Sequence, residues 1–98
     1  MTKGGHVYII TNAHRTTLYI GVSSALIRRI DQHKRHFNKK SFTDRYNLEY
    51  LVYYEDFGRI EDAISREKEL KKLNRQMKNE LITAFNPEWK VLWDEIVG

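Results

Sequence analysis

Cysteine is absent from this chain of 98 residues, and so are long apolar runs. Without cysteine the chain forms neither a disulfide framework nor a thiolate metal site, a composition typical of a reducing compartment. No apolar stretch approaches the roughly 20 residues that a membrane-spanning helix needs. No apolar signal core follows the first five residues, Met1–Gly5. The sequence therefore predicts a cytoplasmic protein.

The motifs of several enzyme classes are missing as well. There is no glycine-rich phosphate loop ahead of a helix and no Gly-x-Ser-x-Gly turn, which excludes P-loop nucleotide hydrolases and serine hydrolases of the common type. The four histidines, at positions 6, 14, 33 and 36, do not have the spacing of a zinc site.

The cationic side chains are concentrated in one segment. The whole chain has a net charge of +4, whereas the segment from Ala25 to Arg45 holds seven lysines and arginines against two aspartates, a net of +5. Such a cluster is expected of a phosphate-binding surface, although a surface that only keeps the protein soluble has the same composition. We expect nucleic-acid binding by Arg28, Lys34, Arg35, Lys39, Lys40 and Arg45.

The order of the elements predicts one α+β domain over residues 1–98. β-Branched and aromatic residues predict three strands, and helical spacing of apolar residues predicts four helices. Asn86, Pro87 and Glu88 have the composition of a helix start. The expected order is β-β-α-β-α-α-α, an antiparallel three-stranded sheet covered by helices. The strands are expected at 6–12, 18–22 and 48–57, the helices at about 25–34, 59–73, from 74 and from 86, and a loop at 35–46.

Two tyrosines lie in the middle of the first two predicted strands, each on the face opposite its aliphatic neighbours. Alternation places Tyr8 on the face opposite Val7 and Ile9, and it places Tyr19 on the same face as Gly21. Most strand tyrosines are structural. A glycine inside a β-branched strand often marks a bulge or the close approach of a ligand or backbone.

Glu67 is the most informative position for chemistry. It lies three residues after Ile64 and three before Leu70, on an apolar helical stripe that also includes Ile60 and Ala63. A carboxylate turned toward a core costs several kcal/mol unless it is paired or binds a metal. The alternative is a surface ion pair with Lys71.

Arg29 and His33 lie one helical turn apart beside the inward stripe of the preceding helix. The arginine would hold a phosphate with two hydrogen bonds, and the histidine would act as a general base or orient a water molecule. The alternative is an arginine at the edge of the core and a histidine held by a backbone carbonyl.

These residues together resemble the GIY-YIG nuclease superfamily, and in particular its small stand-alone bacterial members. His6-Val7-Tyr8 and Tyr19-Ile20-Gly21 are similar to its paired signature, and residues 26–34 resemble the helix with its essential arginine, at Arg29, followed by His33. Residues 63–72 resemble its metal-binding helix, with the glutamate at Glu67. Residues 51–55 and 86–89 also resemble the small members.

The resemblance implies a nuclease that hydrolyses DNA phosphodiesters, as endonuclease or exonuclease, in repair or recombination. Glu67 would bind one Mg²⁺ or Mn²⁺, Arg29 would neutralise charge on the phosphate, and Tyr8, Tyr19 or His33 would activate water, with Tyr8 favoured. Gly21 would leave space for the phosphate. Neither a membrane nor an obligate protein partner is expected.

The chain departs from the family pattern at two places. His6 stands where the signature begins with glycine, and Lys90 stands where larger relatives have asparagine. We expect no room for the separate DNA-binding domain of those relatives. A non-catalytic nucleic-acid-binding module on the same scaffold is the alternative function, and a protein-interaction adaptor is a third.

Overall fold

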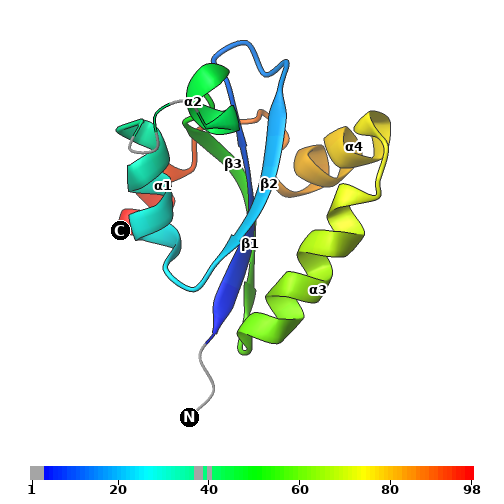
Figure 1. Cartoon of the computed structure of the whole chain (residues 1–98). Helices are drawn as coiled ribbons and strands as arrows, with labels where there is room; N and C mark the ends of the chain where they lie inside the picture. The colour runs from blue at the N-terminus through cyan, green and yellow to red at the C-terminus, as the bar shows by residue number, and fades with distance from the viewer. Residues whose placement is uncertain (1–3, 37–38, 40) are drawn as a thin grey trace.

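The computed structural model describes residues 4–36, 39 and 41–98. The described residues form a three-stranded sheet with helices on both faces (Figure 1). In chain order the elements are β1 (Gly5–Thr11), β2 (Leu18–Ser23), α1 (Leu26–Lys34), α2 (Phe42–Arg45), β3 (Tyr50–Phe57), α3 (Ile60–Lys71), α4 (Arg75–Phe85) and α5 (Trp93–Val97).

The sheet is antiparallel, and its first strand is central. β1 pairs with β2 on one side and with β3 on the other, so β2 is an edge strand. The pairing of β1 with β3 is irregular between Ile9 and Ile10. Figure 1 shows α1 on one side of the sheet and α3 and α4 on the other. The predicted α+β architecture is confirmed.

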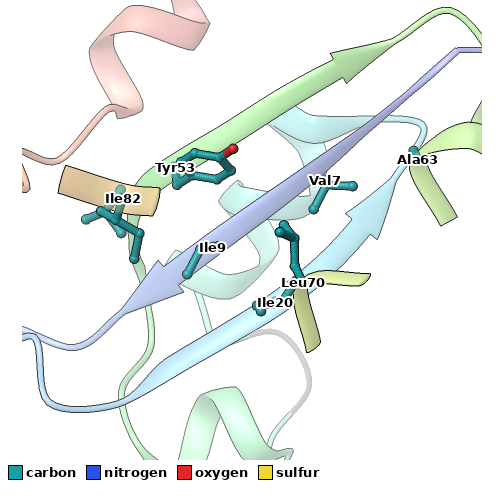
Figure 2. Packing of buried hydrophobic residues seen from close by; sticks show 8 residues of the cluster. Val7, Ile9, Ile20, Tyr53, Ala63, Leu70 and Ile82 are labelled. Carbon is teal, nitrogen blue, oxygen red and sulfur yellow. The ribbon is translucent and has the colours of Figure 1, made fainter. Parts of the chain in front are cut away.

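Each face of the sheet has its own hydrophobic core, because side chains alternate along a strand. Val7 and Ile9 of β1 belong to the core under α3 and α4, shown in Figure 2, and Tyr8 and Ile10 to the core under α1. The predicted alternation is confirmed. The first core consists of Val7, Ile9, Ile20, Val52, Tyr53, Ala63, Leu70 and Ile82, and the second of Tyr8, Ile10, Leu26, Ile30, Leu48, Leu51 and Leu92.

The segment expected to be a loop contains a short helix. α2 is a single turn, and the Ser41 side chain caps it by accepting a hydrogen bond from the Asp44 backbone N–H. Its Thr43 side chain is buried. One turn carries no helical repeat of apolar residues, so hydrophobic periodicity could not reveal it.

The prediction that the last helix starts at Asn86 is wrong. Asn86 instead ends α4, and its side-chain N–H₂ group donates to the carbonyls of Val52 and Lys90 at 3.0 and 2.8 Å. Trp89 has a φ of 53°, in the left-handed region that breaks a helix. The last helix begins only at Trp93. Among the described helices, none has the length and apolar character needed to cross a membrane.

Candidate active site

Tyr8 and Gly21 face each other in the β1–β2 ladder, and the missing side chain at Gly21 makes room for the Tyr8 phenol. A methyl group at position 21 would lie 2.5 Å from Tyr8 Cζ and 3.0 Å from Tyr19 Cε2. Tyr8 itself is buried. Gly21 therefore does mark a close approach, and the neighbour is the phenol of Tyr8. The approach of a phosphate at this position stays a prediction.

A hydrogen-bonded chain of three side chains joins β1, α1 and α2. The Tyr8 hydroxyl lies 3.1 Å from His33 Nε2, and His33 Nδ1 lies 3.2 Å from Thr43 Oγ1. A neutral imidazole has one donor and one acceptor nitrogen. Either Tyr8 donates to Nε2 while Nδ1–H donates to Thr43, or both bonds run in the opposite direction. The chain can therefore carry a proton between the sheet and α2.

Burial keeps the two titratable members of this chain, Tyr8 and His33, neutral at pH 7. Burial, with a smaller effect from the positive charge of Arg29, lowers the pKa of His33 to about 4. Burial also raises the pKa of the Tyr8 phenol. Tyr19 raises that pKa further, Arg29 opposes the change, and the negative charge of Glu67 adds to it. The charges of Arg29 and Glu67 thus both act on the Tyr8 hydroxyl.

Tyr19 completes a cluster of three rings. Its ring centroid lies 6.5 Å from that of Tyr8 and 5.9 Å from that of His33, and the Tyr8 and His33 centroids are also 5.9 Å apart. The three residues come from β1, β2 and α1. Each tyrosine lies opposite its aliphatic neighbours, as predicted, and the structure shows that both meet His33.

Arg29 lies on the exposed side of α1, beside this cluster. Among the residues that the structure describes, it makes no ion pair. It lines a cavity of about 240 Å³ together with Ser23, Ser24, Ala25, Arg28 and Gln32. Two guanidinium groups at one cavity match the geometry of a phosphate, because each presents a planar set of donors.

The negative charge of Glu67 acts on Tyr8 although α3 lies on the other face of the sheet. α3 packs against that face through Ala63 and Leu70, and the Glu67 side chain is 17% exposed. β2 is one of the two edge strands, and α3 packs against it as well as against β1. The prediction that Ile64 belongs to the buried stripe is wrong, because Ile64 is 38% exposed. α3 is therefore rotated slightly, and Glu67 lies at the rim of the core.

Glu67 could supply one carboxylate ligand to a hard cation, as in sites where water and substrate complete the shell. No group of three or more histidines, aspartates and glutamates that could hold a metal is found within residues 4–36, 39 and 41–98. Mg²⁺ commonly binds through one or two carboxylates and completes its shell with waters and substrate phosphates. The Lys71 ammonium lies 3.5 Å from Glu67 Oε2, as the alternative prediction required. A cation at Glu67 would compete with this partly exposed ion pair.

The described members of the six basic residues predicted to bind nucleic acid differ in their contacts, and their binding to nucleic acid stays a prediction. Arg35 pairs with Asp31 at 3.0 Å, and the Lys34 ammonium lies 4.0 Å from the centre of the Trp93 ring. The side chains of Arg28, Lys39 and Arg45 are exposed, and Lys40 lies outside the described residues. The segment therefore spreads over α1, the following turn and α2.

Sequence reasoning missed Thr43, which holds His33 from α2. The sequence around a threonine in a polar, basic segment looks the same whether the side chain faces solvent or a histidine. Its proximity to His33 depends on the path of the chain between α1 and α2. A single sequence holds no signal for that path.

Comparisons with known proteins agree with this arrangement. Residues 4–80 match the family model of the GIY-YIG catalytic domain. The solution NMR structure of the UPF0213 protein BH0048 from Bacillus halodurans is similar, with 28% sequence identity and a TM-score of 0.51. The match covers 83% of this chain and 84% of that protein. No curated protein matches the chain. Since the family model covers most of the sequence, the chain belongs to the GIY-YIG family, whose catalytic domains are typically nucleases.

Proposed function

We propose that this chain hydrolyses DNA phosphodiester bonds, in repair or recombination, with one Mg²⁺ or Mn²⁺ ion bound at Glu67. The hydrogen bond between Tyr8 and His33, beside the charges of Arg29 and Glu67, carries this proposal. A proton acceptor, a phosphate-binding cation and a metal-binding carboxylate are the groups that hydrolysis of a phosphodiester requires.

Tyr8 accepts a proton from the attacking water while its own proton passes to His33 Nε2. The water oxygen forms a bond to phosphorus, the bond from phosphorus to the leaving oxygen breaks, and the departing oxygen takes up a proton from solvent while His33 later releases its proton to solvent. The low pKa of His33 makes it a weak base in the free protein. A bound phosphate places negative charge near Arg29, and this charge favours the protonated imidazole. Substrate binding thus prepares the proton acceptor.

Arg29 stabilises the negative charge that grows on the phosphate oxygens in the transition state. Its exposed position leaves the guanidinium group open to an incoming strand. A divalent cation held by Glu67 supplies Lewis-acid stabilisation of the same charge. Tyr19 packs beside both Tyr8 and His33 and holds their rings in place.

The test compares Glu67→Gln with Glu69→Gln on nicked, branched, duplex and single-stranded DNA in Mg²⁺ or Mn²⁺. Glu69 is the matched control because it lies on the same helix and its side chain is 67% exposed. We expect Glu67→Gln to lower the cleavage rate about 100-fold or more and Glu69→Gln to leave it unchanged. Chelation of the metal should abolish cleavage.

The alternative function is a nucleic-acid-binding module without catalysis, and the Glu67–Lys71 ion pair is the observation that favours it. Such a module would bind DNA in a salt-sensitive manner, indifferent to chelator and to Glu67→Gln. Absence of cleavage on every substrate, or equal cleavage by wild type and Glu67→Gln, would overturn the nuclease proposal. Circular dichroism of both variants shows whether they are folded.

A further inference from the structure

An exposed row of aromatic rings extends from the candidate active site. The ring centroid of Phe42 lies 6.3 Å from that of Tyr19 and 4.8 Å from that of Tyr46. Phe42 is 49% exposed and Tyr46 is 44% exposed. The ring of Tyr19 in turn contacts His33. The row therefore begins inside the ring cluster and ends in solvent.

The fold holds Phe42 and Tyr46 at the surface. On the other side of the same helical turn, Thr43 bonds to His33, and Asp44 lies 2.7 Å from His36 Nδ1. These contacts fix which side of α2 faces the protein. Because Phe42 and Tyr46 are one helical turn apart, both rings lie on the side that faces away.

A shallow cavity of about 330 Å³ runs beside the row. Tyr19 and Phe42 line one part of it, and Lys71 and Lys78 line another. Leu18 and Ile20 of the edge strand contribute the remainder. Exposed rings beside ammonium groups are the combination that single-stranded nucleic acids require, with stacking for the bases and positive charge for the backbone.

We propose that Phe42 and Tyr46 stack against unpaired bases of a DNA strand whose phosphates lie against Lys71 and Lys78. The strand then reaches the cleavage site past Tyr19. A ring that projects from the surface stacks on a base only where the base is free of its neighbours. The chain consequently prefers single-stranded or locally unpaired DNA to an intact duplex. This inference rests on the proposed nuclease function.

The experiment measures binding with cleavage switched off. A fluorescent single-stranded oligonucleotide and the same sequence as a duplex are titrated in the presence of chelator, with wild type, Phe42→Ala and Phe42→Tyr. We expect Phe42→Ala to weaken single-strand binding about 5- to 100-fold, the range for the loss of one base–aromatic stack. Phe42→Tyr keeps the ring and should bind like wild type. Duplex binding should be weak and unaffected by either change.

Phe85→Ala is the matched control, since Phe85 is 47% exposed but lies on α4. It should leave single-strand affinity unchanged. A second readout uses 2-aminopurine within the oligonucleotide, whose fluorescence should change on binding to wild type but not to Phe42→Ala. Circular dichroism confirms that the variants are folded.

The outcomes separate this inference from the proposed function. Unchanged single-strand affinity of Phe42→Ala, or equal losses with duplex, overturns the stacking surface even if the wild type cleaves DNA. Ring-dependent binding by a protein that cleaves no DNA overturns the nuclease and leaves the stacking surface in place.

Discussion

The Tyr8 hydroxyl lies 3.1 Å from His33 Nε2, although 25 residues separate them in the sequence. This contact joins the central strand to α1 through two neutral groups, a buried phenol and a half-buried imidazole. It is also the path of the proton transfer that we propose. The consequences can be measured one residue at a time.

Tyr8→Phe tests the phenol as the group that receives the proton of the attacking water. We expect the cleavage rate to fall about 100- to 10,000-fold, the usual contribution of a general base. DNA affinity should stay the same, and the stability should change by about 1 kcal/mol, because one hydrogen bond is lost. Tyr54→Phe is the control, since Tyr54 pairs with Tyr8 from β3. Equal rates for Tyr8→Phe and wild type would rule out the phenol as the base.

Gly21→Ala tests the space that the Tyr8 phenol occupies. The added methyl group would lie 2.5 Å from Tyr8 Cζ, so the ring must move. We expect a loss of about 1–3 kcal/mol in stability, as for other overpacked sites, together with a strong loss of cleavage. Thermal unfolding of Gly21→Ala, Tyr8→Ala and the double variant measures the coupling. Strictly additive effects would show that the two positions do not compete for space.

NMR titration of the imidazole signals tests the electrostatics of His33. We expect a midpoint near pH 4, because burial and Arg29 lower its pKa to about 4. Arg29→Gln should move the midpoint upward but keep it below the ordinary value of about 6.5, since burial is the larger cause. Arg28→Gln is the neighbouring control. A midpoint near 6.5 in wild type would show that His33 is not buried in solution.

His36 should show the opposite behaviour, three residues further along the chain. Its ring lies 2.8 Å from Glu49 and 2.7 Å from Asp44, and hydrogen bonds to Glu49 and then Asp44 raise its pKa. A raised folded-state pKa stabilises the protein below the unfolded value of about 6.5, and this contribution is lost as the pH rises through the folded pKa.

His36→Gln should therefore cost more stability at pH 6 than at pH 9, with a difference of about 1 kcal/mol. Chemical unfolding at both pH values measures the difference, and His14→Gln, at an exposed turn, is the control. Equal destabilisation at the two pH values would mean that the imidazolium contributes nothing to the fold.

Asn86→Ala tests the hydrogen bonds that the Asn86 side chain makes in place of the expected helix cap. Asn86 is buried and donates to the carbonyls of Val52 and Lys90. Its removal leaves the Val52 carbonyl without this donor, so we expect a loss of about 1–3 kcal/mol. Asn79→Ala on α4 removes only a hydrogen bond with the exposed Arg75 side chain and should cost less. A melting temperature equal to that of wild type would show that water replaces the amide.

Local patterns in the sequence predicted the three strands, the face of each tyrosine and the positions of α1, α3 and α4. These features repeat every two residues in a strand or about every 3.6 in a helix, so one sequence displays them. Glu67 was also visible, because a carboxylate interrupted an apolar stripe.

Tertiary structure decided what Asn86, Thr43 and Phe42 do. An asparagine can cap the start of a helix or donate to a distant carbonyl. Asn86 does the latter because β3 places the Val52 carbonyl next to it. Thr43 meets His33, and Phe42 continues the ring row of Tyr19, because α2 lies beside α1 and β2 in the fold. Hydrogen bonds and ring contacts between remote segments have no period along the chain, so the sequence alone could not specify them.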